Sequence, residues 1–438
     1  MMNRMMNKKW LTLTLASSLF AAALAGCSQS GNAQTSGGTA PAPASATTSA
    51  AATDTASASA APTADATAPG ASSATASAST QTASAEPSSA PTAQASSNPQ
   101  TVSLGTPSAL RMASFKSGWV GGEGWIARTD DSGKTWQTQY TSNHAVVQIF
   151  ALNEQKAWAT LDTGDSKSLQ LVKTTNGGKS WSDAGKVPSH AFLHFVSDTE
   201  AFSGEWMTSD GGAKWTQLSV PKDVVGDVYY HDRSNGWAVT QTAGKKFTFL
   251  RTTDGGKNWK PVYSRALEGP INGAVIRSAG KNDAWIELIG DSGMTQTSYS
   301  LFHTSDGGKS WLPVVANNTA GAGPAPGFKM NDKNLHTNTG NSPGTLYVVD
   351  TKTAFLGGQC QACDNPNTLG HTTDGGKTWV NAKPELPGYG TQLIAAADAK
   401  QVWWILTGNE QPAVMYTSQD SGAHWTKTHA FAKPKQQS

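Results

Sequence analysis

Thr252-Thr253-Asp254-Gly255-Gly256-Lys257-Asn258-Trp259 is one of seven copies of the same pattern in this chain. Every copy fits Ser/Thr-x-Asp-x-Gly-x-x-Trp, except that Asn176 replaces the aspartate in the second copy. Such repetition indicates an architecture built from repeated units. The seven copies run from Thr129 to Trp136, Thr174 to Trp181, Thr208 to Trp215, Thr252 to Trp259, Thr304 to Trp311, Thr372 to Trp379 and Ser418 to Trp425.

Each copy is predicted to form a tight hairpin turn. In the fourth copy, the β-rich runs Phe247-Thr248-Phe249-Leu250 and Trp259-Lys260-Pro261-Val262 flank the turn, and glycine between such runs supplies positive φ at little cost. The aspartate is expected to accept backbone N–H groups of its own turn, and the tryptophan to cover the hairpin. We therefore predict a structural role for Asp131, Asn176, Asp210, Asp254, Asp306, Asp374 and Asp420, and for Trp136, Trp181, Trp215, Trp259, Trp311, Trp379 and Trp425.

A small-then-aromatic step precedes each copy and is expected to pack between neighbouring units. An apolar run comes before each step, so four short strands per repeat predict an all-β, seven-bladed β-propeller over residues 107–438. Residues 101–106 either add a strand to the last blade or belong to the preceding segment. The steps are Gly118-Trp119, Ala157-Trp158, Ala201-Phe202, Gly236-Trp237, Ala284-Trp285, Ala354-Phe355 and Val402-Trp403.

The pattern resembles the Asp-box, or BNR repeat, of sialidases, sortilin-type receptors and the photosystem II assembly-factor family. Gly118-Trp119-Val120 and Gly236-Trp237-Ala238-Val239, each followed by a box, are most similar to the last of these families. The resemblance implies that each box joins the third and outermost strands of a blade, away from the ligand-binding face. It also implies an envelope-associated, non-enzymatic role in protein binding or assembly. No cofactor is expected.

The N-terminus has the features of a targeting segment. Arg4, Lys8 and Lys9 precede a short apolar run, and Leu24-Ala25-Gly26-Cys27 follows it. The last four residues resemble a bacterial lipobox, which implies cleavage before Cys27 and attachment of lipid to its sulfur. Residues 1–26 are then a lipoprotein signal peptide, and the protein is expected at the extracytoplasmic face of the cell membrane, bound only through its lipid. The alternative is an ordinary secretory signal.

Residues 27–106 are predicted to be a disordered tether. They consist mostly of Ala, Ser, Thr, Pro and Gln, and Asp54, Asp65 and Glu86 are their only charged residues. Such a composition buries too little apolar surface to offset the entropy of ordering. The tether either sets the distance from the membrane or has no particular length requirement.

Charge and cysteine content restrict the partners. The formal net charge is +2 and 15% of residues are charged, so a nucleic-acid partner is not expected. Of the three cysteines, Cys27 is assigned to lipid, and Cys360 and Cys363 remain as a predicted disulfide outside the cytoplasm. A redox or zinc role is disfavoured because no βαβ pattern and no second ligand pair lie nearby. No metal site is predicted.

The face opposite the boxes is the expected ligand face. The long stretch Ala316 to Gly344, rich in Asn, Gly, Pro and Thr, is predicted to form a loop there and to meet the Cys360–Cys363 segment. This loop either has a function or is a floppy insertion. The candidate ligand-face residues are Asp162, Lys245, Arg265, Asp291, Tyr389 and Glu410.

Binding without chemistry is the predicted function, with an envelope protein or a glycan as the partner. The alternative is a glycan-binding or glycoside-hydrolysing propeller. A sialidase needs an arginine cluster for a carboxylate and a tyrosine nucleophile, but Arg128 and Arg251 lie beside boxes. A two-carboxylate glycosidase stays open, because Asp162, Asp291 or Glu410 could pair across the channel. No catalytic residue is assigned, and the sequence does not name the ligand.

Overall fold

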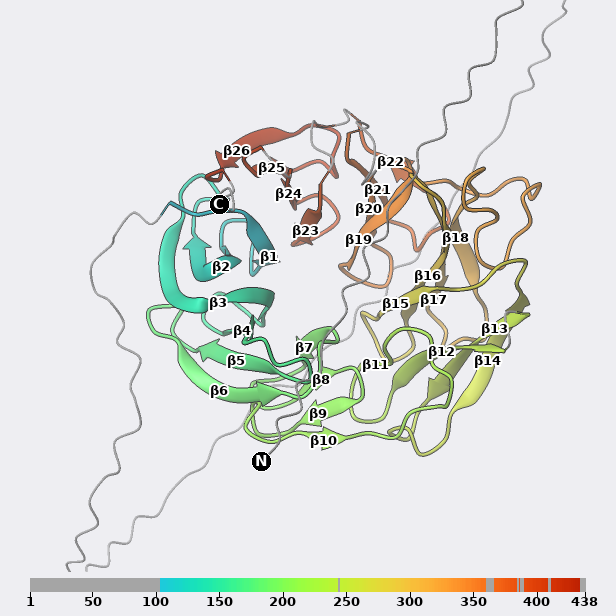
Figure 1. The fold of residues 1–438 in the computed structure, drawn as a ribbon, viewed down its shortest axis with the longest axis horizontal. Helices are drawn as coiled ribbons and strands as arrows, with labels where there is room; N and C mark the ends of the chain where they lie inside the picture. The colour runs from blue at the N-terminus through green and yellow to red at the C-terminus, as the bar shows by residue number, and fades with distance from the viewer. Residues whose placement is uncertain are drawn as a thin grey trace, which may run out of the picture. The chain divides into compact units, whose positions relative to one another are not determined.

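The computed structural model describes residues 103–242, 245–359, 366–383, 386, 390–408 and 411–433. The chain divides into two units, Met1–Glu86 and Pro87–Ser438, and every described residue belongs to the second unit. Within these ranges the regular secondary structure consists of β-strands, arranged as antiparallel sheets around a common centre (Figure 1). No helix there is long and apolar enough to cross a membrane.

The described strands form six sheets, one with six strands and five with four. The six-stranded sheet contains β1 (Pro107–Met112), β2 (Gly118–Thr129), β3 (Gln137–Ala151), β4 (Ala157–Asp162), β5 (Leu169–Thr174) and β6 (Ser182–Val187). The next two contain β7 (Leu193–Phe195), β8 (Ala201–Ser203), β9 (Trp206–Thr208) and β10 (Thr216–Gln217), then β11 (Tyr229–Tyr230), β12 (Gly236–Thr242), β13 (Lys246–Thr252) and β14 (Lys260–Ala266).

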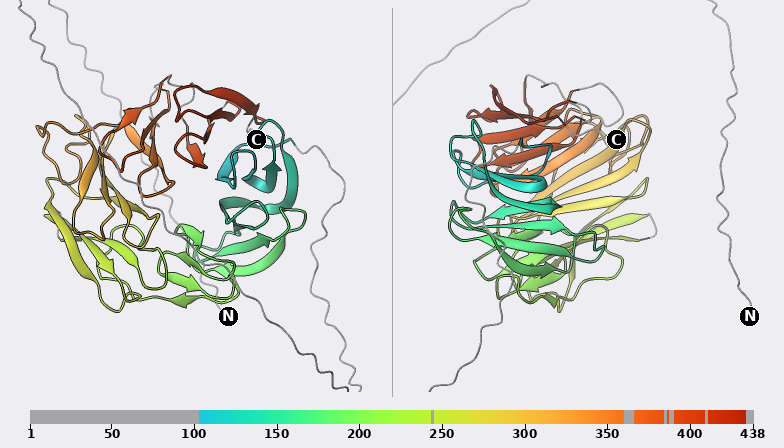
Figure 2. Two further views of the ribbon diagram at one scale, coloured as in Figure 1. Left: turned by 180° about the vertical axis from the view of Figure 1, so that it is seen from behind. Right: turned by 60° about the vertical axis from the view of Figure 1, so that its left-hand side comes forward.

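The last three sheets lie in the C-terminal half of the chain. They contain β15 (Gly273–Arg277), β16 (Ala284–Ser292), β17 (Thr297–Thr304) and β18 (Leu312–Asn317), then β19 (Ser342–Val348), β20 (Ala354–Gln359), β21 (Thr368–Thr372) and β22 (Val380–Asn381), and finally β23 (Gln392–Ala396), β24 (Val402–Leu406), β25 (Val414–Ser418) and β26 (Thr426–Ala430). In each sheet, the strand that comes first in sequence, such as β11, β15 or β19, lies nearest the centre of the ring (Figures 1 and 2).

The sheet count corrects the expectation of seven blades, because the described residues form six sheets. The N-terminal part of β2 pairs with β1, and its Trp125–Arg128 part pairs with β3. Strand β3 likewise continues from pairing with β2 to pairing with β4. Gly124, with φ of 77°, lets β2 bend without a break. Because both strands continue, the first two repeats form one sheet that carries two boxes.

Hydrophobic packing follows the repeats rather than the sheets. Seven clusters of buried residues lie between successive repeats. Each cluster joins a box tryptophan to the second-strand aromatic of the preceding repeat, so every box contributes to the contact with its neighbour. The pairs are Trp136 with Trp403, Trp181 with Trp119, Trp215 with Trp158, Trp259 with Phe202, Trp311 with Trp237, Trp379 with Trp285, and Trp425 with Phe355.

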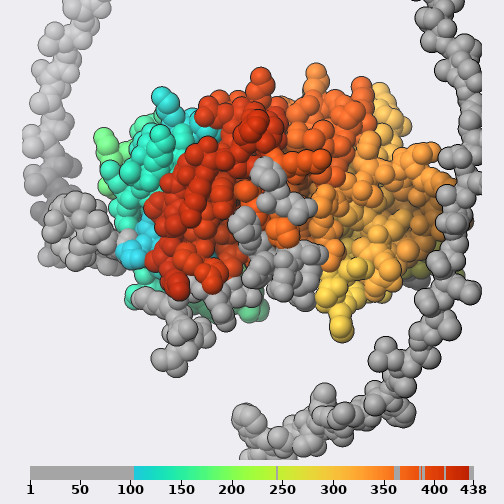
Figure 3. All heavy atoms as spheres, turned by 90° about the horizontal axis from the view of Figure 1, so that it is seen from above, coloured from blue at the N-terminus to red at the C-terminus, as the bar shows by residue number. Residues whose placement is uncertain are grey.

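The ring closes by contact between the two ends of the propeller. The backbone N–H of Ala432, just after β26, donates to the carbonyl of Leu104 at 2.8 Å. Leu104 and Phe431 are also buried in the same hydrophobic cluster as Met112 and Trp403. Figure 3 shows the N-terminal strands, in cyan, beside the C-terminal sheet, in red. Leu104 therefore extends the edge of the last sheet, which the sequence left open.

The long segment between β18 and β19 is packed against the propeller. The side-chain amide of Asn317 donates to the carbonyl of Asn338 at 2.6 Å, and its Oδ1 accepts the Asn338 N–H at 2.8 Å. Phe328 is buried and stacks on Phe302 with 5.7 Å between centroids. Farther along, Asn341 N–H donates to the carbonyl of Gln359. The segment thus reaches the residue before Cys360, although Cys360 and Cys363 lie outside the described residues.

Candidate functional site

All seven boxes have the same internal hydrogen bonds. In the fourth box, the Thr252 hydroxyl donates to Asp254 Oδ1 at 2.8 Å and accepts the Gly256 N–H at 2.9 Å. Asp254 Oδ1 also accepts the Asn258 N–H at 2.9 Å. Equivalent bonds to the carboxylate or amide oxygen occur at Asp131, Asn176, Asp210, Asp306, Asp374 and Asp420.

These bonds account for the behaviour of the box carboxylates. Hydrogen bonds from Asn258 and Thr252 lower the pKa of Asp254 to about 2. At the second box, Asn176 Oδ1 accepts the Ser180 N–H at 3.0 Å, so an amide performs the same structural task. The box oxygens are therefore engaged within their own turns, and this geometry supplies no ligand site.

Arginines and aromatic rings meet on the inner strands instead. The guanidinium carbon of Arg111, on β1, lies 4.5 Å from the Phe150 ring centroid and 5.9 Å from that of Tyr347. The guanidinium carbon of Arg277, on β15, lies 3.8 Å from the Phe192 centroid. The five ion pairs found among the described residues include neither arginine. Both cations are therefore paired with aromatic faces rather than with carboxylates.

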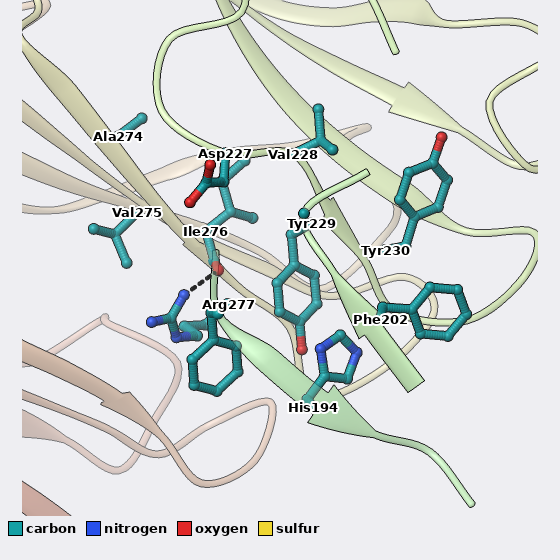
Figure 4. Close-up of a pocket in the computed structure, with 12 residues that line it drawn as sticks. His194, Phe202, Asp227, Val228, Tyr229, Tyr230, Ala274, Val275, Ile276 and Arg277 are labelled. Carbon is teal, nitrogen blue, oxygen red and sulfur yellow. Dashed lines mark hydrogen bonds between the residues drawn. The ribbon is translucent and has the colours of Figure 1, made fainter. Parts of the chain in front are cut away.

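A pocket of about 120 Å³ opens beside Arg277. It lies between the inner strands β7, β11 and β15, which come from three successive sheets (Figure 4). Aromatic and apolar side chains make up most of its wall, and the charged groups are few. The lining residues that matter for its chemistry are Phe192, His194, Phe202, Asp227, Tyr229 and Arg277.

His194 is the buried polar group of this pocket. The residue is only 7% exposed, and its ring stacks on Tyr229 with 4.7 Å between centroids and 6° between planes. Neither ring nitrogen has a hydrogen-bond partner within standard distance and angle. The backbone of Tyr230 nevertheless lies close enough to oppose the fall in the pKa of the ring. Burial, followed by the charges of His231 and Arg277, lowers the pKa of His194 to about 3. The imidazole is therefore neutral at physiological pH.

Two carboxyl groups respond to the charge of Arg277. Glu287, on β16, is 2% exposed and its Oε1 has no hydrogen-bond partner. Burial raises the pKa of Glu287 to about 8, and Arg277 opposes that rise. Asp227 is an exposed residue, but partial desolvation of its carboxyl raises its pKa, again against the effect of Arg277. Glu287 is thus largely protonated at neutral pH and leaves the charge of Arg277 uncompensated.

Four of the six residues expected on the ligand face belong to the described part of the chain. Asp162 Oδ1 accepts the Gly164 N–H at 2.8 Å, and Asp291 Oδ1 accepts the Ser292 N–H at 2.9 Å. Lys245 lies in the turn after β12, where its N–H donates to the Thr242 carbonyl at 2.8 Å. Arg265 places its guanidinium carbon 4.3 Å from the Phe328 centroid and packs on the long segment. None of these four lines the pocket. Cys27, Tyr389 and Glu410 are outside the described residues.

Sequence reasoning missed His194, Asp227, Tyr229 and Arg277. One signal was available, because Arg277 ends the otherwise apolar run Ala274-Val275-Ile276, and Glu287 interrupts a similar run. A charged residue in a buried strand commonly marks a functional or paired group. Within the described part of the chain, no group of His, Cys, Asp and Glu side chains could hold a metal ion.

A ring of antiparallel sheets whose hairpins carry Asp-boxes defines an Asp-box β-propeller. Within that class, this chain resembles the photosystem II assembly factors. The family model described as photosynthesis system II assembly factor YCF48 matches residues 207–354. Among curated proteins, none matches the chain by sequence.

Several solved structures are similar to this chain. One is YCF48 bound to D1 peptide, with 16% identity, a TM-score of 0.41, and coverage of 74% of this chain and 93% of that chain. Another is a GH74 enzyme of Niastella koreensis, with 13% identity, a TM-score of 0.31, and coverage of 76% and 74%. A prolyl endopeptidase matches with 12% identity, a TM-score of 0.48, and coverage of 76% and 50%. None of these similarities transfers a function to this chain.

Proposed function

We propose that this protein is a lipid-anchored, extracytoplasmic propeller that binds a polypeptide segment of an envelope protein without catalysing a reaction. The observation that carries the proposal is Arg111 on β1. Its guanidinium contacts the rings of Phe150 and Tyr347, and its buried Nε has no hydrogen-bond partner. Arginine and tyrosine are enriched among the residues that dominate binding energy at protein interfaces.

The chemistry of Arg111 suits a polypeptide. A guanidinium presents five N–H donors in a planar fork, which matches carboxylates and carbonyl oxygens. The aromatic rings hold the plane of the guanidinium without using those donors. A bound segment that supplies a carbonyl or carboxylate oxygen would therefore complete the hydrogen bonds of a group that is already oriented. The match of residues 207–354 to an assembly-factor family supports a protein as the partner.

Glycoside hydrolysis is the alternative, and the geometry gives it less support. Asp162 accepts the Gly164 N–H and Asp291 accepts the Ser292 N–H, and neither carboxylate lines the inner-strand pocket. Glu287 is buried and protonated, which suits a general acid, but no described carboxylate is placed as its partner across a substrate-sized space. A non-catalytic role is therefore the simpler proposal.

Crosslinking in cells tests the binding proposal. A photo-reactive amino acid would replace Tyr347, beside Arg111, and in a matched protein would replace Val380, which is 50% exposed on the outer strand β22. We expect a specific envelope protein to be captured from position 347 and not from 380, and Arg111→Gln to reduce that capture. Equal products from both positions, or capture of polysaccharide alone, would contradict polypeptide binding at the inner strands.

The anchor and the cysteine pair are proposed from the sequence and need separate tests. Cys27→Ser should move the protein from the membrane fraction to the soluble extracytoplasmic fraction. Mass spectrometry of the unaltered protein should find an N-terminal peptide that carries lipid on Cys27. For Cys360 and Cys363, mass spectrometry of non-reduced peptides should find a bridge. Two free thiols in protein taken from the envelope would rule the disulfide out.

A further inference from the structure

We propose that the pocket beside Arg277 binds a small free α-amino acid as its zwitterion, with the carboxylate on Arg277 and the ammonium group on Asp227. Arg111 does not line this pocket, although its charge acts on the pocket residues His194 and Tyr229. The proposal does not depend on the polypeptide contact at Arg111. Three observations carry it: two opposite charges that do not meet, the volume of the pocket, and the unpartnered imidazole of His194.

Asp227 and Arg277 line the same pocket without touching each other. Asp227 immediately precedes Val228 and β11, and Arg277 is the last residue of β15. Figure 4 shows both side chains on the same side of the Tyr229 ring. Each charge acts electrostatically on the other group, yet no ion pair within 4.0 Å joins them. A gap therefore separates a cation from an anion.

A zwitterion fits this gap because it supplies both opposite charges. Charge-assisted hydrogen bonds span about 2.8 Å each, so an ammonium group against Asp227 and a carboxylate against Arg277 would bridge two groups that make no ion pair with one another. The only hydrogen bond of the Arg277 guanidinium in the described structure goes to the carbonyl of Ile276, at 2.9 Å. A ligand with a carboxylate alone would lie close to Asp227 with no cation to offset it.

The enclosed volume suits one small group. The pocket measures about 120 Å³, whereas an engineered cavity of about 150 Å³ holds benzene. Alanine has as many non-hydrogen atoms as benzene, and a hexose has twice as many. Phe192, Phe202 and Ile276 provide apolar wall for a short side chain. An alanine-sized amino acid therefore fits, and an enclosed sugar ring does not.

His194 is the second, independent indication of a ligand. It lines the pocket, it is buried, and both ring nitrogens lack partners. A neutral imidazole offers one donor and one acceptor, and native proteins rarely leave both unsatisfied. A zwitterion carries acceptors on its carboxylate and donors on its ammonium group, so it complements either tautomer of the ring.

Titration calorimetry of the full chain in detergent micelles tests the proposal with L-alanine as the probe. N-Acetyl-L-alanine lacks the ammonium group, and L-alaninamide lacks the carboxylate. We expect saturable binding of L-alanine and at least tenfold weaker binding of both analogues. Arg277→Gln should remove the preference for L-alanine over L-alaninamide, and Asp227→Asn should remove its preference over N-acetyl-L-alanine. The His194 ring signals in NMR spectra should shift on addition of L-alanine.

The controls separate this site from other outcomes. Arg265→Gln is the matched variant, because Arg265 also packs on a phenyl ring but lies on the outer strand β14, and it should leave alanine binding unchanged. Equal binding of N-acetyl-L-alanine by the unaltered protein would overturn the proposal in favour of a site for a chain terminus. Equal binding of L-alaninamide, or neither heat nor NMR shifts at millimolar alanine, would also overturn it. These comparisons use the unaltered chain, so they hold even if a variant folds poorly.

Discussion

The indole ring of Trp136, in the first Asp-box, meets that of Trp403, on β24, edge to face with 6.2 Å between their centroids. Trp311 and Trp237 make the same kind of contact between two successive repeats, with 5.7 Å between centroids and 89° between planes. The two ends of the propeller are therefore joined by the packing used between successive repeats. Closure needs no special device beyond the added hydrogen bond from Ala432 to Leu104.

Truncating the closing contact should destabilise the whole ring. Trp403 is fully buried, so Trp403→Ala is expected to lower the free energy of unfolding by about 3–5 kcal/mol. Val380→Ala, at an exposed outer position, should change it by less than about 0.5 kcal/mol. Urea denaturation followed by tryptophan fluorescence and circular dichroism measures both. Similar losses for the two variants would mean that the Trp136–Trp403 contact is not needed for closure.

The box aspartates should matter for stability and not for binding. Asp254→Ala removes the acceptor of the Thr252 hydroxyl and the Asn258 N–H, so it should lower the melting temperature. Asp254→Asn should lower it less, because Asn176 makes the corresponding bonds in the second box. Thermal melts rank the two variants. If a variant still folds but no longer captures the envelope protein in the crosslinking experiment at position 347, the box has a binding role.

Acid should weaken the boxes over a defined range. Hydrogen bonds within the turns lower the pKa of Asp254, Asp306 and Asp420 to about 2, from an ordinary value of 3.8. A carboxylate with a depressed folded-state pKa stabilises the fold above its unfolded pKa, and that stabilisation disappears as pH falls through the folded value. Melting temperature should therefore drop between about pH 4 and pH 2. Asp254→Asn should reduce the steepness of that drop, and an unchanged pH profile would contradict the assignment.

The sequence predicts features that are local. The box is recognisable because its hydrogen bonds stay within one turn, from Thr252 to Asn258. The continuity of β2 through Gly124 cannot be recognised from the sequence. A glycine-rich bend has the same composition whether the chain starts a new strand there or continues the old one. The sheet count therefore differs from the count of boxes.

The pocket could not be predicted for a related reason. His194, Asp227 and Arg277 are far apart in sequence and meet only when three inner strands come together around the ring. Asp162, at the end of β4, and Asp291, near the end of β16, instead accept backbone N–H groups one or two residues further along the chain. Polar character alone does not separate a turn-forming carboxylate from one that faces a ligand.

One histidine should contribute far more to stability than its counterpart in the next sheet. His303 and His371 both precede a box and stack on a second-strand aromatic, Trp285 or Phe355. His303 Nε2 lies 2.9 Å from Oδ1 of Asp283, which is buried, and its Nδ1 lies 2.9 Å from the carbonyl of Gly375 in the next box. His371 Nδ1 has no partner.

His303→Phe should therefore be costly and His371→Phe mild. The first variant leaves the Asp283 carboxylate buried with the Ala279 N–H as its remaining bond, which should cost about 3–5 kcal/mol. The second replaces a ring that burial keeps neutral, by lowering its pKa, and should cost less than about 1.5 kcal/mol. Denaturant titration of both variants at neutral pH gives the comparison. Equal losses would show that the Asp283 contact adds little.

Glu287 should make the propeller less stable in mild alkali. Burial raises the pKa of Glu287 to about 8 in the folded protein, against 4.5 for an ordinary glutamate, and Arg277 opposes that rise. An acid with a raised folded-state pKa is held in its protonated form by the fold, so stability is full below the unfolded pKa and falls as pH rises toward the folded value. The free energy of unfolding then changes by at most about 1.4 kcal/mol per pH unit.

Glu287→Gln keeps the shape of the protonated carboxyl and carries no titrating proton. The free energy of unfolding of this variant should therefore change less with pH between about pH 5 and pH 9, a range that roughly covers the two pKa values. Unfolding in urea at intervals across that range tests this, with the unaltered protein alongside. Parallel pH profiles for the two proteins would show that Glu287 is ionised in the fold and paired with Arg277.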